Sequence, residues 1–457
     1  MIPPNWFGQK AFQVLKLLAA IGSETANARG LMGLLKSETM TQLSNDCFAS
    51  GPPVLSVDEA VALIAARVGA VEGTETVPLH RADGRVLAAD LVAPLPLPLF
   101  TNSAVDGYAV ASADLPLEAE QALPVSGRVA AGAATLPPLA PGHAARIFTG
   151  APLPAGADTV FMQEDVPIDA QGRVVLPPGQ QPGANVRRAG EDVAAGRVVL
   201  RAGVRLRPQD VALAAALGQS DLAVRRRIRV AVASTGDEVV PPGAPRGSAQ
   251  VFDANRFMLM ALLERLGCDV ADLGILPDQR ARVADSLKAA AAGHDLIVTS
   301  GGVSTGEEDH VRAGIESVGQ LVLWRMAIKP GRPVAMGVVD GTALIGLPGN
   351  PVASFVTYAY VVRPTVLSLA GARQTRTMAM PVRAAFTHDK KPGRREFLRA
   401  SLCRAADGGV EAVKFDRQGA GMLSSLVETD GLVELAEDVT HVAPGDSVGF
   451  LSYADLD

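Results

Sequence analysis

The sequence predicts a multidomain protein that combines α/β and β domains. Strand-like and helix-like segments alternate as βαβαβ between residues 228 and 299. Two other regions, 93–195 and 378–457, contain many short β segments separated by turn signals and no long helix. Alternation of this kind is typical of a parallel sheet with right-handed crossovers, whereas runs of short strands are typical of β domains. The 457 residues are enough for two to four domains.

The net charge, the cysteines and the length of the apolar runs indicate which partners and which cellular compartment to expect. The net charge of −6 argues against a nucleic-acid or anionic-membrane partner. The three cysteines, Cys47, Cys268 and Cys403, lie far apart and form neither a disulfide framework nor a metal-binding spacing, which predicts a reducing cytoplasm. No run approaches the length of a membrane span, so we expect no membrane partner.

The first 50 residues are expected to lie outside the fold. Residues 11–21 are apolar, but Lys16 lies inside this run and no clear Ala-x-Ala site follows, which favours an amphipathic helix over a signal peptide. Met40 offers a second plausible start. The capping-box spacing of Ser56 and Glu59 then opens a predicted helix that runs to about Val68.

Residues 93–195 are predicted to form a mostly β insertion with its own core. Asp106–Gly107 is a turn signal between apolar runs and predicts a hairpin tip. Thr149–Gly150 follows a strand and could offer a hydroxyl and a free N–H. The segment from Arg187 to Asp192 is either a solvated charged loop or an oxyanion-binding arginine with a carboxylate nearby. A helix is predicted from Pro208 to Leu217.

The βαβαβ region predicts a ligand site at one edge of its sheet. Strands are expected at 228–234, 270–276 and 296–299. Helices are expected at 255–266 and 280–292, and Asp253 should cap the helix at 255–266. Ligands of parallel sheets gather at the carboxyl ends of the strands. That edge should carry Asp237, Glu238, Asp278, Ser300 and Asp309.

The stretch 295–309 sharpens this prediction. A buried strand breaks at Ser300, Gly301 and Gly302, and a helix start rich in acids follows. Free backbone N–H groups at such a turn suit an oxyanion, but the following acids would repel it unless a divalent cation lay between them. The stretch therefore predicts an anion site that also holds a metal. The alternative is a tight turn whose acids favour the helix dipole.

Two later segments add to the same edge. Lys329 and Arg332 flank a Pro-Gly turn and supply the cations that an anion needs. Residues 343–351 repeat the strand, turn and helix start, with Pro348, Gly349 and Asn350 in the turn, and the helix is expected to run to about Leu369. Residues 378–457 predict a small β-barrel, within which 419–425 is either a flexible turn with two hydroxyls or a linker-like loop.

These motifs together resemble the MoeA-type molybdopterin molybdenumtransferase family, which includes the C-terminal domain of gephyrin. The matching pieces appear in family order from about residue 52: Asn102–Ala109, Thr149–Pro154, Arg187–Asp192, Ser234–Glu238, Asp253–Arg256, Ser300–Ser304, Lys329–Gly331 and Leu347–Pro351. Three positions depart from the family pattern: Thr101 stands where Asp is usual, Val105 where Met is usual, and Arg325 where Lys is frequent.

The resemblance implies an elongated homodimer of four-domain chains with a shared active-site cleft. A molybdopterin-binding βα domain would comprise 51–75 and 222–377, and a small linking domain 76–92 and 196–221. The β insertion at 93–195 and the C-terminal barrel at 378–457 complete the chain, and 1–50 is an N-terminal extension.

The implied reaction inserts molybdenum from molybdate into adenylylated molybdopterin and releases AMP, with Mg²⁺ or alternatively Zn²⁺ as cofactor. The resemblance assigns catalytic roles to Asp106, Asp192, Asp278, Asp309 and Lys329, and metal binding to Glu238 and Asp309. It assigns substrate binding to Thr149, Arg187, Ser300, Gly301, Gly302, Ser304, Arg332, Pro348, Gly349, Asn350, Ser424 and Ser425. A molybdopterin adenylyltransferase and recipient molybdoenzymes are implied partners.

Two other functions remain open from the sequence. Molybdopterin adenylyltransferases share the Thr-Ser-Gly-Gly-Val-Ser turn, but they have a single domain, so the segments 93–195 and 378–457 weigh against this function. A gephyrin-like scaffold without catalysis would keep the fold, yet it would not need these five residues together: Asp106, Asp192, Glu238, Asp309 and Lys329.

Deletion of residues 1–39 is expected to leave the melting temperature and AMP release unchanged, because no family motif precedes Met40. Thermal unfolding and turnover of the 40–457 fragment, compared with the full chain, test this. A loss of several degrees in melting temperature would show that the extension contributes to the fold.

Overall fold

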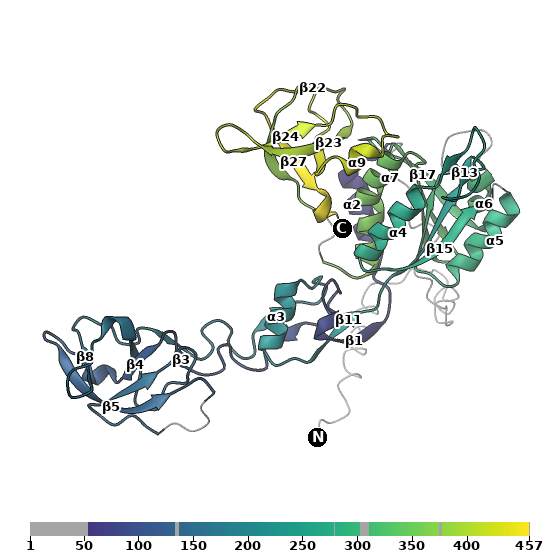
Figure 1. Ribbon diagram of the computed structural model, residues 1–457. Helices are drawn as coiled ribbons and strands as arrows, with labels where there is room; N and C mark the ends of the chain where they lie inside the picture. The colour runs from purple at the N-terminus through teal and green to yellow at the C-terminus, as the bar shows by residue number, and fades with distance from the viewer. Residues whose placement is uncertain (1–53, 133–136, 278, 302–309, 374–376, 457) are drawn as a thin grey trace, which may run out of the picture. The chain divides into compact units, whose positions relative to one another are not determined.

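The computed structural model describes residues 54–132, 137–277, 279–301, 310–373 and 377–456 (Figure 1). The predicted extension 1–50 lies outside these residues. Helix α2 (Val57–Arg67) confirms the capping box, since the Ser56 hydroxyl accepts from the Glu59 N–H at 3.2 Å and the Glu59 carboxylate accepts from the Ser56 N–H at 2.8 Å.

The central sheet is mixed rather than wholly parallel. Its strand order is β15 (Asp269–Leu276), β12 (Arg229–Thr235), β16 (Leu296–Ser300), β20 (Thr342–Leu347), β19 (Pro333–Val339) and β17 (Gly319–Arg325). The first four strands are parallel, as the sequence predicts, whereas β19 runs antiparallel to both of its neighbours. The turn between β19 and β20 explains this, because Asp340 and Gly341 both have positive φ, as a two-residue hairpin turn requires.

Alternate residues of the sheet feed two hydrophobic cores. Val230 and Val232 pack with α2, α4 (Asn255–Arg265) and the helical segment 351–369, whereas Ala231 and Ala233 pack with α5 (Arg280–Ala291) and α6 (His310–Val318). Helices therefore cover both faces of the sheet (Figure 1). A sheet buried on both faces reads as a continuous apolar run, which is how β12 and β16 appear in the sequence.

The cap predicted for α4 is wrong in one respect. The N-cap residue is Ala254, whose side chain makes no cap hydrogen bond. Asp253 accepts from the Arg256 N–H at 3.3 Å, but its two oxygens also bind the Ser234 hydroxyl at 2.8 Å and the Arg256 guanidinium at 2.7 Å.

The helical segment 351–369 contains an irregular turn. It consists of α7 (Pro351–Thr357), the π-helical turn η4 (Tyr358–Val362) and α8 (Arg363–Leu369). Pro364 lacks the N–H that would bind the Tyr360 carbonyl, and its ring pushes that carbonyl aside, which accounts for the wider turn. By length and composition this helix could cross a membrane, against the sequence expectation, but 89% of its most apolar window is buried inside the fold.

The insertion is β, as predicted, and no α-helix occurs in its described residues, 93–132 and 137–195. Its sheet has the order β7 (Thr159–Met162), β4 (Gly107–Val110), β6 (Ala144–Ile147), β5 (Gln121–Val129) and β8 (Arg173–Leu176). The predicted hairpin at Asp106–Gly107 is wrong, because the preceding strand β3 (Asn102–Ser103) pairs with β9 (Val186–Arg187) and not with β4. Glycine is required at 107, since a Cβ there would lie 1.8 Å from the Phe161 carbonyl oxygen.

Short paired segments connect the insertion to the βα domain. β1 (Thr74–Pro78) pairs with β11 (Asp221–Arg225), and β2 (Leu91–Val92) pairs with β10 (Val198–Leu200). Helix α3 (Pro208–Ala216) confirms the predicted helix and packs on them. The remaining short elements are β13 (Val239–Val240), β14 (Val251–Phe252), η1 (Leu79–Arg81), η2 (Ser112–Asp114), η3 (Gln163–Asp165) and η5 (Tyr453–Asp455).

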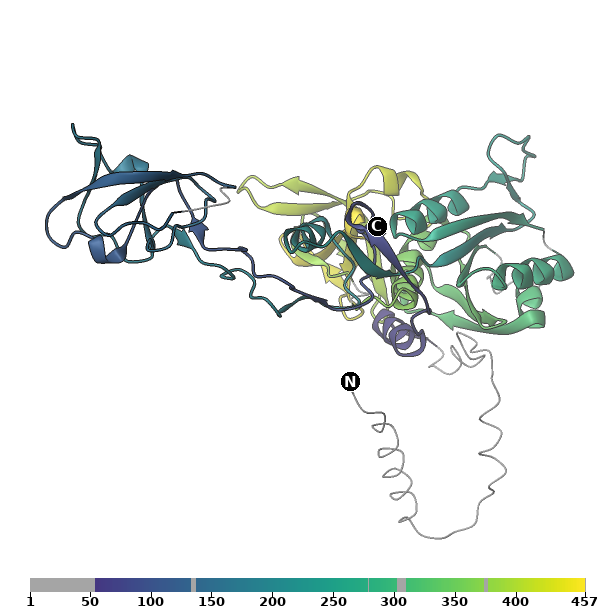
Figure 2. The same cartoon turned by 90° about the horizontal axis from the view of Figure 1, so that it is seen from below.

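The C-terminal region, coloured yellow in Figure 1 and Figure 2, is a closed barrel by its strand pairing, as predicted. β23 (Arg395–Arg404), β24 (Val410–Lys414), β21 (Met380–Ala384), β27 (Ser447–Ser452) and β25 (Gly431–Leu435) form a ring that the β23–β25 pairing closes. β22 (His388–Asp389) and β26 (His441–Val442) form a ribbon beside it, and α9 (Ser424–Val427) replaces part of the predicted turn at 419–425. β18 (Ile328–Lys329), from the βα domain, pairs with β23.

Candidate functional site

The turns at the ends of β16 and β20 are tied together by one side chain. The Asn255 amide donates to the Ser300 hydroxyl at 2.9 Å and to the Gly349 carbonyl oxygen at 2.8 Å. Gly301 follows with φ +88°, and a Cβ there would lie 2.6 Å from the Thr235 carbonyl oxygen. Three parallel strands therefore end within one hydrogen-bonded cluster, at the edge where the sequence predicts a site.

Replacing Asn255 with alanine is expected to lower the free energy of unfolding by about 1–3 kcal/mol, because the buried Ser300 hydroxyl and the Gly349 carbonyl lose their donor. Urea unfolding measures the change. Asn350→Ala is the matched control, since Asn350 is exposed and makes no cap hydrogen bond. Equal stabilities of the two variants would contradict the role of Asn255 in holding the two turns together.

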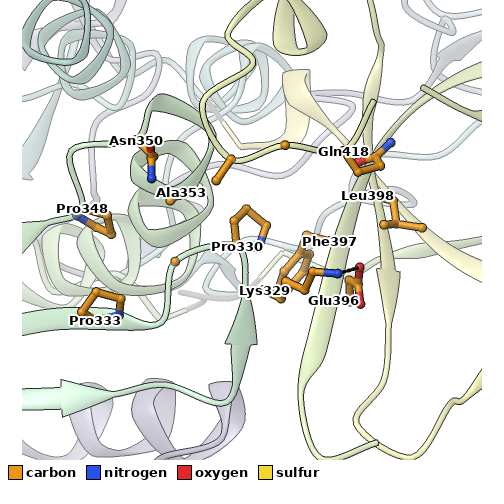
Figure 3. A pocket seen from close by; sticks show the side chains of 13 residues that line it. Lys329, Pro330, Pro333, Pro348, Asn350, Ala353, Glu396, Phe397, Leu398 and Gln418 are labelled. Carbon is orange, nitrogen blue, oxygen red and sulfur yellow. Dashed lines mark hydrogen bonds and ion pairs between the residues drawn. The ribbon is translucent and has the colours of Figure 1, made fainter. Parts of the chain in front are cut away.

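A cavity of about 410 Å³ lies where the βα domain meets the barrel. Its walls are the loop that begins at Lys329, the turn before α7, β23 and the loop 418–420 (Figure 3). Three predicted site residues line it, namely Lys329, Pro348 and Asn350. The barrel contributes Glu396 and Gln418, which the sequence did not single out.

Lys329 and Glu396 face each other across a strand pair that joins the two domains. They are register partners in the β18–β23 pairing, and the Lys329 ammonium donates to Glu396 Oε1 at 2.7 Å (Figure 3). The Lys329 side chain is 52% exposed, whereas that of Glu396 is 6% exposed. Gly331 lets this loop press against α7, since a Cβ there would lie 2.7 Å from the Thr357 hydroxyl oxygen. The ammonium thus projects into the cavity while its carboxylate partner stays buried.

The barrel loop on the opposite wall is held by a buried arginine. The fully buried Arg399 guanidinium donates to the Ser425 hydroxyl at 2.9 Å and to the Gly419 carbonyl at 3.0 Å. Burial lowers the pKa of Arg399. Ser425 therefore supports the loop and does not line the cavity, while Ser424 is exposed at the start of α9.

The N-terminus of α7 faces the same loop. The Val352 N–H donates to the Ala420 carbonyl at 3.0 Å, which joins the helix start to the barrel. Pro351 begins the helix and has no N–H to leave unpaired. The positive end of the helix dipole and the Lys329 ammonium act on one cavity, and both favour a negatively charged ligand.

The predicted residues of the insertion form a separate group. Asp106 Oδ1 accepts from both the Thr149 N–H and the Thr149 hydroxyl, each at 2.8 Å, and these bonds lower the pKa of Asp106. The Gly150 N–H donates to the Ser103 carbonyl at 2.9 Å. The predicted hydroxyl is therefore bonded to Asp106, and the expectation of a free N–H at Thr149–Gly150 is wrong, because both N–H groups have partners.

The other predicted residues are spread along exposed segments. Arg187 is exposed in β9, Asp192 is exposed and its N–H donates to the Leu97 carbonyl at 3.1 Å, and Arg332 is exposed beside the cavity loop. Asp278, Gly302, Ser304 and Asp309 lie outside the described residues. Their assigned roles stay predictions.

The described residues do not assemble a metal site by themselves. Within them, no three His, Cys, Asp or Glu side chains gather closely enough to hold a metal ion. Glu238 lies in the described turn after β12, but its predicted partner Asp309 does not lie in the described part. The metal therefore stays a prediction.

Sequence reasoning missed the barrel's contribution to the cavity. Glu396, Gln418 and Arg399 lie on or beside a strand that reads as an ordinary barrel strand. One signal was present: Arg395 and Glu396 begin the predicted strand and Arg399 interrupts its apolar residues, and charges inside a predicted core strand need partners.

Comparison with known proteins defines the class of this fold and site. Residues 231–368 match the family model for a probable molybdopterin binding domain. Residues 55–218 match the MoeA N-terminal region, domains I and II, and residues 381–453 match the MoeA C-terminal region, domain IV. The chain thus contains an α/β domain of the molybdopterin-binding class, with a MoeA N-terminal region before it and a MoeA C-terminal region after it.

The chain belongs to the MoeA family. It is 38% identical over 396 residues to the molybdopterin molybdenumtransferase of Haemophilus influenzae, covering 86% of this chain and 98% of the relative. It is 33% identical over 408 residues to the molybdopterin molybdenumtransferase of Nostoc sp., covering 87% and 93%. The crystal structure of the molybdopterin biosynthesis MoeA protein from Pyrococcus horikoshii OT3 superposes with a TM-score of 0.74 at 29% identity, covering 88% and 100%.

Proposed function

We propose that this chain inserts molybdenum from molybdate into adenylylated molybdopterin and releases AMP. Insertion of molybdenum into molybdopterin, a step of molybdenum cofactor biosynthesis, follows from membership of a family whose curated relatives are named molybdopterin molybdenumtransferases. The observation that carries the rest is the cavity that joins the Lys329 ammonium to the N-terminus of α7. Molybdate and the pyrophosphate of the substrate are both oxyanions, which such a site favours.

The residues of this chain act mainly by positioning and electrostatics. Lys329 holds an oxyanion at the cavity, the positive end of α7 favours it electrostatically, and the backbone at Ser300 and Gly349 sets the shape of the edge. The Thr149 N–H and hydroxyl keep Asp106 ionised, so Asp106 is suited to orient a cation, while its lowered pKa makes it a weaker base. Fixed donors and charges of this kind stabilise developing charge without reorganisation.

A divalent cation completes the proposal. Mg²⁺, or alternatively Zn²⁺, bound by Glu238 and Asp309 would neutralise the repulsion between these carboxylates and the pyrophosphate. We expect Asp309→Asn to remove metal-dependent AMP release while the melting temperature stays unchanged. Wild-type turnover of this variant at saturating Mg²⁺ would show that Asp309 has another role.

We also propose a homodimer whose active-site cleft combines the insertion of one subunit with the βα domain of the other. Asp106→Ala and Lys329→Ala, each inactive alone, should regain activity when they are unfolded together, mixed equally and refolded. About half of randomly paired dimers are mixed, and each carries one intact cleft, so about a quarter of the wild-type sites should return. No recovery, with mixed dimers verified by mass spectrometry, would place the whole site within one chain.

Reconstitution tests the function directly. The purified chain is incubated with adenylylated molybdopterin, molybdate and Mg²⁺, and both AMP release and activation of an apo-molybdoenzyme are measured. We expect both signals to require molybdate. A protein that binds partners but produces neither signal would be the gephyrin-like scaffold. We place this reaction in the cytoplasm, with an adenylyltransferase supplying the substrate and molybdoenzymes receiving the product.

A further inference from the structure

The Lys329 ammonium already has an anionic partner before any ligand arrives. Its Nζ donates to Glu396 Oε1 at 2.7 Å, and the same oxygen lies 3.2 Å from His388 Nε2. One carboxylate oxygen is therefore shared by a lysine that lines the cavity and a histidine that does not. Because the Lys329 side chain is 52% exposed, it can turn towards a ligand, whereas the Glu396 side chain, at 6%, stays in place.

We propose that Glu396 competes with incoming oxyanions for Lys329, and that His388 becomes the partner of Glu396 when an oxyanion draws Lys329 away. Binding of the oxyanion is then coupled to the uptake of a proton by His388. The inference deepens the proposed function and rests on it for the identity of the oxyanion, molybdate.

The burial of Glu396 makes a replacement partner necessary. A buried carboxylate that loses the ammonium bonded to it is destabilised by more than a surface ion pair is worth. Lys390 and Arg399 act on Glu396 through space, but their hydrogen bonds go to other groups. The pairing of β18 with β23 fixes Glu396 beside the cavity, so the carboxylate cannot follow the lysine into solvent. His388 is already in contact with Glu396 Oε1, and its side chain is 14% exposed.

The surroundings of His388 keep it neutral while Lys329 remains paired. Burial lowers the pKa of His388, the Lys414 and Lys329 ammonium groups act in the same direction, and Glu396 opposes them. Lys414 Nζ lies 3.5 Å from His388 Nδ1 and donates to the Thr387 carbonyl at 2.9 Å. The adjacent Asp389 pairs instead with His441, at 2.7 Å.

When Lys329 leaves Glu396, the charges around His388 change so that its pKa rises. One of the charges that lower the pKa of His388 is removed, and Glu396, which raises it, is no longer shared. The pKa of His388 therefore rises on binding, and Nδ1 takes a proton from solvent while Nε2–H continues to donate to Glu396. The protonated Nδ1 lies 3.5 Å from the Lys414 ammonium, which limits the rise of this pKa, and Lys414 keeps the Thr387 carbonyl as its acceptor.

Calorimetric titration of the full chain with molybdate tests the coupling without any turnover. Titrations at about pH 7, where an imidazole of ordinary pKa changes charge, are repeated in two buffers with different ionisation enthalpies to count protons. We expect the wild-type protein to take up a fraction of a proton per site, and none at about pH 9. His388→Gln should bind molybdate without proton uptake.

Glu396→Gln tests the competition for Lys329 directly. Removal of the competing charge should tighten molybdate binding by roughly tenfold and abolish proton uptake. Glu428→Gln is the matched control, because it neutralises an exposed carboxylate of the same barrel region and should change neither quantity. Tightening in the control as well would mean that net charge, not the exchange, governs binding.

Three results would overturn the inference: binding by the wild-type protein without proton uptake, uptake retained in His388→Gln, or equal or weaker binding by Glu396→Gln. A wild-type protein that transfers molybdenum but shows no such exchange would leave the proposed function intact. If the protein took up a proton on binding molybdate but did not transfer molybdenum, the cavity would be an oxyanion site that serves another function.

Discussion

Lys329→Ala should lower kcat/KM for molybdate by about 100-fold to 1000-fold, the range expected when one charged group that stabilises an anionic transition state is removed. Its ammonium is the cation that lines the cavity from the βα side, and it stands at the strand pair that joins the two domains. Lys329→Arg should recover activity only in part, because a planar guanidinium does not fill the place of a compact ammonium. Steady-state AMP release at varied molybdate measures both variants.

The fold should not change in either variant, because His388 remains in contact with the buried Glu396 carboxylate. Lys329 is half exposed, and the strand pairing at this position uses its backbone. Lys391→Ala, a change at an exposed lysine of the barrel region, is the control and should retain wild-type turnover. If Lys329→Ala matched this control, Lys329 would be a surface residue without a role in the reaction.

Arg395→Met should lower the free energy of unfolding by about 3–5 kcal/mol, which is the cost of removing one partner from a buried ion cluster. The Arg395 side chain is 8% exposed and binds Asp58 at 2.7 Å, Glu434 at 2.8 Å and Glu437 at 3.1 Å. The substitution would leave three carboxylates without their shared cation. These acids raise the pKa of Arg395, so it stays charged at every pH at which the protein is folded.

A partly exposed arginine of the same barrel, Arg383, provides the comparison. Arg383 pairs with Asp407 at 2.6 Å, but these side chains are 37% and 60% exposed. Arg383→Met should therefore lower the free energy of unfolding far less than Arg395→Met does. Denaturant unfolding at two salt concentrations measures the loss in free energy of unfolding for each variant. A loss at Arg395 no larger than that at Arg383 would mean that the buried cluster contributes little net stability.

The sequence predicts the βα elements well because each is encoded locally. These signals depend on neighbouring residues only: the capping box at Ser56–Glu59, the apolar runs of β12 and β16, and the glycines that follow the two predicted helices, Gly267 and Gly293. The antiparallel strands β17 and β19 were not predicted, although Asp340–Gly341 is a strong hairpin signal. The predicted hairpin at Asp106–Gly107 shows the opposite error, since β4 pairs with strands far along the chain.

The site was predictable on the side where strands end and not on the side of the barrel. Strand, turn and helix start recur at 300 and 348, so Ser300, Pro348 and Asn350 could be placed together. Glu396 meets Lys329 only because β23 pairs with β18, and no local pattern encodes a pairing across 67 residues. Ser425 could not be distinguished from a ligand-binding hydroxyl without knowing that Arg399 is buried behind it.

The π turn in the segment 351–369 sets the rotational phase of the helix on either side of it. At this turn the Arg363 N–H reaches back five residues to the Tyr358 carbonyl, one more than in an α-helix. The Tyr358 hydroxyl donates to the Leu262 carbonyl at 3.1 Å, towards α4, while the Tyr360 hydroxyl donates to Glu434 at 3.1 Å, on the barrel. Removing one residue here would rotate α8 by about 100° relative to α7 and turn its apolar stripe away from the core. Chimaeras of family members should therefore exchange this helix whole, because a splice point inside it can change the phase even where the two sequences look alike.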